Sequence, residues 1–217
     1  MHIFLELQAQ GAHNINLVTP THYVPHLRWA IPRARELGLT VPVVYNSSGY
    51  ERVESLRTLS GLVDVYLPDL KFFAPSVSQK WCAAGDYFDY ASQAVFEMFR
   101  QVGVPSFDGN GLLQRGLMIR HLLLPGGLED SKCVVDWVLD NLPRAVYFNL
   151  MAQYTPLGQA AQYPELSRRV TSAEYEELVD YALARGLENG YLQDVDSASA
   201  EYVPDFDLAG VCAKSEI

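Results

Sequence analysis

The sequence predicts an α/β fold in which parallel strands form an open or partial barrel, and two regularities lead to this class. The first is a set of short apolar runs with the length of strands buried on both faces. They cover residues 14–18, 41–45, 63–67, 117–124 and 146–151. The second is the helix-like sequence between most of these runs, which spaces them by about one βαβ unit. Five units are too few for the usual eight-stranded closure, so we expect a partial barrel.

The stretches between the runs carry apolar side chains at helical spacing and typical helix ends. Helices are expected over residues 4–10, 24–37, 51–59, 87–102, 129–142 and 172–187. Pro32 predicts a kink in the second of these. Thr171 or Ser172, followed by acidic residues at 174 and 176, predicts a capped start for the last. Two segments fit neither element: an aromatic-rich excursion over 72–88 and a turn-rich loop over 106–115.

The order of elements predicts how the chain is organised. Its first element has the pattern of a helix rather than a strand, so we expect the first βα unit of the barrel to be missing from it. Residues 1–193 are expected to form this incomplete barrel, and the acidic, weakly patterned residues 194–217 a C-terminal tail. A length of 217 residues suits one domain of this kind.

Composition excludes several classes of function. The net charge of −10 argues against nucleic-acid binding, which needs basic surface stripes. No apolar stretch approaches the roughly 18 residues of a membrane span. The three cysteines, Cys82, Cys133 and Cys212, are odd in number and far apart, which favours reduced thiols in a cytoplasmic protein over a disulfide framework.

Polar residues follow each apolar run, where the carboxyl ends of barrel strands form an active site. The candidate site residues are Thr19, Thr21, Asn46, Ser48, Asp69, Lys71, Arg120, Gln153 and Tyr154. Asp69 and Lys71 are the strongest pair, because positions two apart on an extended strand share a face; a structural ion pair at the barrel rim is the alternative. Arg120 is suited to grip a carboxylate from inside the barrel, and its neighbour His121 is expected in the core.

Each of the other candidates has a structural alternative. Thr21 could cap the following helix, and the Asn46 to Ser48 turn could be a strand-to-helix loop with a capping serine. Tyr154 could be plain packing. None of the histidines or cysteines stands at metal-ligand spacing, so no metal ligand is predicted.

Several long strings resemble the radical S-adenosylmethionine (SAM) superfamily, in the branch named for pyruvate formate-lyase activating enzymes. They are LQAQGAHNINLVTPTHYVP, VPVVYNSSGYE, GLVDVYLPDLKF, EMFRQVG, GLMIRHLLLPGG, LMAQYTPLGQ and YPELSRRVTSAEYEE. The resemblance covers essentially the whole chain. It implies a partial TIM-like (βα) barrel, reductive cleavage of SAM at a [4Fe–4S] cluster, and hydrogen abstraction from a protein glycine, as in glycyl radical enzymes, or from a small molecule.

The resemblance also implies roles for the candidates. Thr19 and Thr21 stand where relatives receive the amino group of SAM, and Asn46 and Ser48 would reach its ribose or carboxylate. Asp69 and Lys71 match a D-x-K motif that reaches SAM or substrate. Arg120 belongs with the SAM-binding residues, and Gln153 and Tyr154 lie near the adenine side. The family's C-x3-C-x2-C loop, whose thiolates hold the cluster, is absent from this sequence, so we expect no cluster and no radical chemistry on this chain alone.

Two other functions remain open. A Schiff-base lyase or aldolase would use Lys71 as its nucleophile, with Asp69 relaying the proton. A non-catalytic, cluster-free remnant would bind a ligand or a protein partner instead. The missing first strand would leave an unpaired sheet edge, so this hypothesis predicts dimerisation through the open edge of the barrel.

Overall fold

The computed structural model of the chain describes residues 1–192. The predicted tail at 194–217 lies outside the described residues. The elements alternate between strands and helices, beginning with α1 (His2–Ala9), which precedes the first strand. No helix within residues 1–192 is long and apolar enough to cross a membrane.

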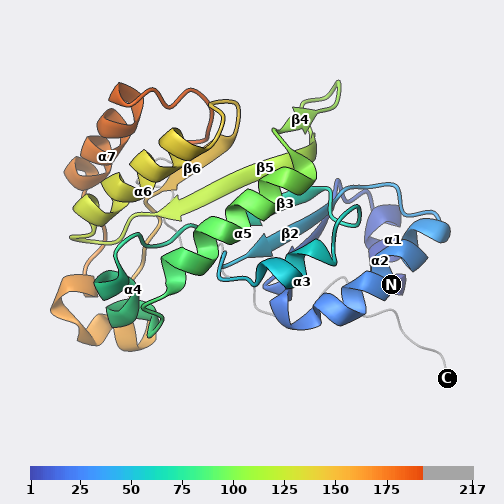
Figure 1. Cartoon of the computed structure of the whole chain (residues 1–217), viewed down its shortest axis with the longest axis horizontal. Helices are drawn as coiled ribbons and strands as arrows, with labels where there is room; N and C mark the ends of the chain where they lie inside the picture. The colour runs from blue at the N-terminus through green and yellow to red at the C-terminus, as the bar shows by residue number, and fades with distance from the viewer. Residues whose placement is uncertain (193–217) are drawn as a thin grey trace.

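Five parallel strands lie side by side in the order in which they occur along the chain (Figure 1). They are β1 (Ile15–Val18), β2 (Val43–Ser47), β3 (Val65–Pro68), β5 (Leu113–Leu122) and β6 (Tyr147–Met151). Each overlaps one of the apolar runs, so the predicted strands and their parallel pairing are confirmed. The carboxyl ends of all five therefore meet at one edge of the sheet.

Helices connect the strands and pack on one face of the sheet. They are α2 (Val24–Glu36), α3 (Val53–Arg57), α5 (Tyr87–Val102), α6 (Leu128–Asn141) and α7 (Ser172–Ala184), with α5 and α6 drawn in front of the strands in Figure 1. Alternate strand residues, among them Tyr45, Tyr66 and Phe148, are fully buried in the core shared with these helices. The residues between them face the opposite, inner side. The fold is a partial, TIM-like α/β barrel.

The segment 106–115, predicted as a loop, contains a hairpin. The short strand β4 (Ser106–Phe107) pairs antiparallel with the start of β5, which therefore begins at Leu113 rather than at 117. The Asp108 carboxylate accepts hydrogen bonds from the backbone N–H groups of Asn110 and Leu112, and so folds the turn. The turn chemistry was visible in the sequence, but a two-residue strand gives too little alternation to detect.

The aromatic-rich excursion contains a helix that the sequence pattern did not predict, α4 (Pro75–Cys82). Pro75 occupies its first turn, where the missing N–H costs nothing. The Asp130 carboxylate accepts hydrogen bonds from the backbone of Phe73, at 3.0 Å, and of Ala74, at 2.7 Å. One side chain of α6 thus fixes the chain just before α4. The capped start of the last helix is confirmed as a reciprocal capping box between Thr171 and Glu174.

After α7 the chain returns alongside β6. The Phe148 backbone N–H donates to the Asn189 carbonyl at 3.0 Å, and Leu150 forms a parallel bridge with Leu192. A Cβ on Gly190 would lie 2.1 Å from the Phe148 carbonyl oxygen, so a glycine is needed for this close approach. Residues 189–192 therefore continue the parallel order one step beyond β6.

Candidate functional site

Arg120 lies at the centre of a polar cluster at the carboxyl ends of the strands. Its Nε is 2.9 Å from Asp69 Oδ1, its Nη2 is 2.7 Å from the same oxygen, and Nη2 also donates to Asn46 Oδ1 at 2.7 Å. These three residues come from β5, from the end of β3 and from β2. The backbones support the contact, because Asp69 and Arg120 form a parallel bridge. The predicted convergence of these side chains is therefore present in the structure.

Lys71 completes this group, which we call the strand-end cluster (Asn46, Asp69, Lys71 and Arg120). Its Nζ lies 3.0 Å from Asp69 Oδ2, so Asp69 pairs with one cation through each oxygen. The Lys71 side chain is 39% exposed and that of Arg120 26%. Two cations share one carboxylate, which leaves the cluster with a net charge of +1 at a solvent-accessible position. Such a group can attract a further anionic oxygen.

Tyr87 holds the loops that carry the cluster. Its buried hydroxyl lies 2.9 Å from the Ser48 and Asp69 carbonyl oxygens and accepts a hydrogen bond from the Lys71 backbone N–H at 2.9 Å. Gly49, with φ +76°, packs so closely that a Cβ would lie 2.2 Å from the Asp69 carbonyl oxygen. The loops after β2 and β3 are thus locked to each other and to α5. Ser48 contributes its carbonyl to this lock, while its residue surface is exposed.

Glu51 forms a second polar group, although the sequence pattern placed it only at the start of a helix. It is 2% exposed, and its Oε1 accepts hydrogen bonds from Thr21 Oγ1 at 2.5 Å and Tyr45 Oη at 3.2 Å. Its Oε2 is buried with no hydrogen-bond partner in the described part of the chain. Burial raises the pKa of the Glu51 carboxyl above its ordinary value, although the neighbouring hydroxyls of Thr21, Tyr45 and Ser47 oppose this shift.

The loop after β1 contains the two predicted threonines. Thr19 has left-handed backbone angles (φ 52°, ψ 51°), and its N–H donates to the Asn46 carbonyl at 2.8 Å. Thr21 bonds Glu51 and does not cap α2, whose N-cap is Tyr23 with no side-chain hydrogen bond. The capping alternative for Thr21 is therefore wrong. Glu51 instead ties the loop after β1 to the loop after β2.

His121 is a core residue, as predicted. It is 1% exposed; its Nδ1 lies 2.7 Å from the Leu70 carbonyl and its Nε2 2.8 Å from Ser131 Oγ. Burial lowers the pKa of the His121 imidazole, so the ring is neutral. In that form Nδ1 donates to the carbonyl and Nε2 accepts from the serine hydroxyl.

The two candidates after β6 lie in a different setting. The Tyr154 hydroxyl donates to the Leu166 carbonyl at 2.9 Å, and burial raises the pKa of this phenol. Tyr154 therefore fastens the segment η3 (Pro164–Leu166) and does not join the strand-end cluster. Gln153 is exposed, with its amide nitrogen 3.9 Å from Met151 Sδ. The structure gathers Asn46, Asp69, Lys71 and Arg120, but not the whole predicted set.

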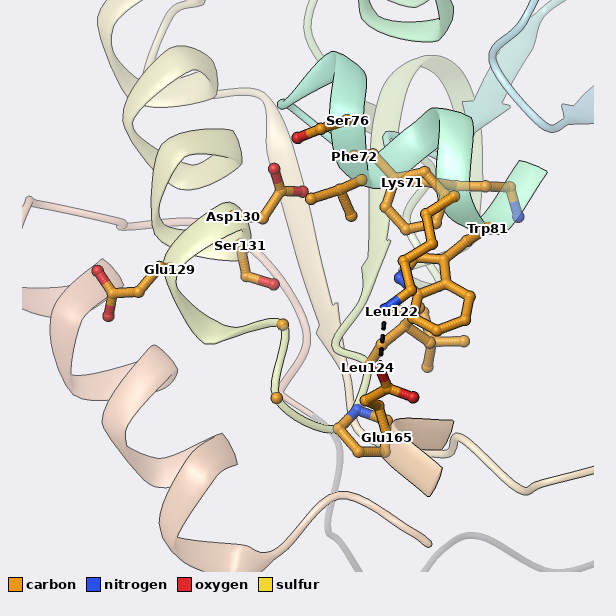
Figure 2. Close-up of a pocket in the computed structure, with 15 residues that line it drawn as sticks. Lys71, Phe72, Ser76, Trp81, Leu122, Leu124, Glu129, Asp130, Ser131 and Glu165 are labelled. Atoms are coloured by element: carbon orange, nitrogen blue, oxygen red, sulfur yellow. Dashed lines mark hydrogen bonds and ion pairs between the residues drawn. The ribbon is translucent and has the colours of Figure 1, made fainter. Parts of the chain in front are cut away.

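A pocket of about 460 Å³ lies beside the cluster, between α4, the end of β5 and the start of α6 (Figure 2). Its walls are mainly apolar, formed by Phe72, Val77, Trp81, Leu122, Leu124 and Pro125. Lys80 and Glu165 close one side with an ion pair of 2.8 Å. The Trp81 and Tyr163 rings also meet edge to face, with centroids 5.5 Å apart. Two insertions, one after β3 and one after β6, thus meet over the strand ends.

Metal ligands are not grouped in the part of the chain that the structure describes. Residues 1–192 include no set of three His, Cys, Asp or Glu side chains placed to hold a metal ion. Cys82 on α4 and Cys133 on α6 are both exposed free thiols. Cys212 falls outside the described residues.

Comparison with known proteins relates this chain to one relative and one fold. No protein-family model matches the sequence. The uncharacterized protein MJ0674 of Methanocaldococcus jannaschii is 33% identical over 174 residues, which make up 78% of this chain and 46% of the relative. The chain thus spans about half the length of the curated relative that it matches.

A solved domain of pyruvate-formate lyase-activating enzyme from Bacteroides vulgatus has a similar structure. The TM-score is 0.57 at 14% sequence identity, and the match covers 83% of this chain and 98% of that domain. The two share a fold. At this level of identity the likeness concerns the backbone arrangement and carries no assignment of individual residues.

Two residues that matter to the geometry did not stand out in the sequence. Glu51 could have been suspected, because an acid that follows shortly after an apolar run is close enough to fold back on the strand end. Tyr87 carried no such signal, because its hydroxyl reaches the cluster only through the tertiary packing of α5 on β3. No local pattern distinguishes it from the other tyrosines nearby.

Proposed function

We propose that this chain is the barrel portion of a radical SAM enzyme and that it binds SAM at the strand-end cluster. The observation that carries the proposal is the meeting of Arg120, Lys71, Asp69 and Asn46 at the ends of three neighbouring parallel strands. The shared fold with a domain of a pyruvate-formate lyase-activating enzyme supports it. So do the SAM-superfamily strings in the sequence.

The cluster is chemically suited to the amino-acid end of SAM. That end carries a carboxylate and an ammonium group, and the cluster offers two cations, each within 3.0 Å of one carboxylate. Arg120 can present two N–H groups to a carboxylate, and Asp69 can accept from an ammonium. Asn46 in β2 and Ser48 in the loop after it offer amide and hydroxyl groups to the ribose. Thr19 and Thr21 are proposed to line the same mouth from the loop after β1.

The described residues do not fit an iron–sulfur cluster, which needs three thiolates close together. We therefore derive no reaction step through a cluster, and we expect this chain alone to bind SAM without cleaving it. The full activity that we propose is hydrogen abstraction from a protein glycine or from a small molecule, in the cytoplasm, with the cluster ligands supplied from beyond the described residues. Association of two copies through the β1 edge is part of the same proposal.

Calorimetric titration with SAM and with 5′-methylthioadenosine, which lacks the amino-acid end, tests the proposal. Because the cluster should recognise the amino-acid end, we expect SAM to bind about tenfold or more tightly than methylthioadenosine. Arg120→Met should remove this difference. Arg33→Met, which removes an exposed cation on α2, should keep it. Equal affinities of the native chain for the two ligands, or no saturable binding of SAM, would overturn the assignment.

The second candidate function is Schiff-base catalysis by Lys71. It rests on the position of this lysine, which lines the pocket while its Nζ lies 3.0 Å from Asp69. An ammonium in an ion pair is not a nucleophile, so Asp69 would first have to accept its proton. Borohydride trapping with a small aldehyde should then label Lys71 and spare Lys132. Equal labelling of both lysines, or of neither, would exclude this function.

A further inference from the structure

The apolar pocket and the strand-end cluster adjoin at Lys71, which belongs to both. Asp69 and Lys71 lie two positions apart at the end of β3, as do Arg120 and Leu122 at the end of β5. On an extended strand such positions share a face. Asp69, Lys71 and Arg120 belong to the cluster, and Lys71 and Leu122 line the pocket. The polar contacts among Asn46, Asp69 and Arg120 therefore lie next to an apolar pocket under α4.

Most of the charged side chains around the apolar pocket are already paired within the protein. Lys71 pairs with Asp69, Lys80 with Glu165 and Glu129 with Lys132. The Asp130 carboxylate is occupied by two backbone N–H groups. The hydroxyl of Ser131 is similarly engaged by His121. Apart from Lys71, which is part of the positively charged strand-end cluster, these groups are therefore not free to recognise a charged ligand.

The surface that remains is apolar and partly aromatic. Figure 2 shows Phe72, Trp81, Leu122 and Leu124 around the same space. Trp81 is positioned from outside, by the edge contact with Tyr163 and by the Lys80 ammonium 4.4 Å from its ring centroid. A volume of about 460 Å³ falls within the usual range of small-molecule sites, ~300–1,000 Å³.

We infer that this pocket binds a neutral aromatic group of a second ligand, separate from the proposed SAM site. Moving an uncharged ring out of water costs little free energy, and the ring gains contact with the Trp81 and Phe72 rings. A carboxylate beside the Trp81 and Phe72 rings, away from Lys71, would meet no unpaired cation. That the ligand is the substrate of the enzyme rests on the proposed function. The binding of an aromatic group to the pocket does not depend on the proposed function.

The test uses the full chain, without SAM, and 5-fluoroindole followed by its fluorine NMR signal. We expect saturable binding at one site. 5-Fluoroindole-2-carboxylate should bind about tenfold or more weakly, because it would bury an unpaired charge. Val77→Trp should fill the pocket and weaken 5-fluoroindole at least about tenfold, and Leu124→Trp should do the same from the opposite wall. Val104→Trp, at a 43% exposed position outside the pocket, should bind like the native chain.

Three results would overturn the inference. They are 5-fluoroindole binding that survives both filling variants in folded protein, stronger binding of the carboxylate, and displacement of 5-fluoroindole by adenosine, which would make the pocket the nucleoside end of the SAM site. Titration of the same variants with SAM separates this inference from the proposed function. A Val77→Trp chain that binds SAM but not 5-fluoroindole supports both.

Discussion

The Arg120 guanidinium lies across the Asp69 carboxylate, with Nη2 2.7 Å and Nε 2.9 Å from a single oxygen. This leaves the other oxygen of Asp69 to Lys71. The geometry makes Arg120 the link between three strands, since it also bonds Asn46. A residue in this position should matter to stability as well as to ligand binding.

Arg120→Met should lower the free energy of unfolding by about 1–2 kcal/mol, between the values for exposed and buried ion pairs. The variant removes the hydrogen bonds to Asn46 and Asp69 but leaves Asp69 paired with Lys71. Urea denaturation measures the change. The matched control is Arg33→Met, whose pair with Glu36 is exposed on both sides and should contribute less than about 0.5 kcal/mol. Equal losses in the two variants would contradict a linking role for Arg120.

Gly49→Ala should be strongly destabilising, because the new Cβ would lie 2.2 Å from the Asp69 carbonyl oxygen. Gly61 has the same φ of +76°, but a Cβ added there would meet nothing within 4 Å, so Gly61→Ala isolates the backbone cost alone. That cost is about 1–2 kcal/mol. We expect thermal or urea unfolding to show a clearly larger loss for Gly49→Ala. Similar losses for the two glycines would mean that the loops after β2 and β3 are not tightly packed.

Glu51 should make stability depend on pH. Its pKa in the folded chain is raised above the ordinary 4.5, mainly by burial, so the folded state binds a proton more readily than the unfolded state. Stability should therefore fall as pH rises from about the ordinary carboxyl value through the raised one. Glu51→Gln, which cannot ionise, should flatten this part of the profile.

Urea denaturation of both chains from about pH 4 to about pH 8 measures the difference. His22 faces the same carboxyl and opposes the shift, so the profile should be compared with that of His22→Gln. Glu54→Gln, at an exposed position on α3, is the control for loss of one negative charge. A Glu51→Gln profile that runs parallel to the native one would show that folding does not raise the pKa of this carboxyl.

Tyr87→Phe should cost about 1–3 kcal/mol, because it leaves the Lys71 N–H and two carbonyl oxygens without their shared hydroxyl. Tyr90 lies on the same helix and is 40% exposed, so Tyr90→Phe should change stability by less than about 0.5 kcal/mol. Hydrogen exchange of the Lys71 amide should also speed up in Tyr87→Phe. Unchanged exchange there would argue against Tyr87 as the holder of the loop.

The strand ends could be predicted from sequence because parallel strands bring them to one edge wherever the helices pack. Asp69, Lys71 and Arg120 were found in this way, and the alternation of the fourth strand correctly sent His121 to the core. The contributions of Tyr87 and Asp130 could not be found, because each reaches its partners through packing between elements far apart in sequence. Helix α4 was missed for a related reason, since its start depends on a carboxylate from α6.

Helix α4, which covers the apolar pocket, is attached to the rest of the fold by two sets of contacts of unequal strength. Toward α6, the chain before α4 is clamped by backbone hydrogen bonds to Asp130. On the side of η3, α4 is attached by the ion pair between Lys80 and Glu165, whose side chains are about half exposed. Dissolved salt weakens this exposed ion pair far more than it weakens the backbone hydrogen bonds to Asp130. Raising the ionic strength should therefore increase access to the apolar pocket, because it weakens the contact between α4 and η3 while the contact between α4 and α6 stays in place.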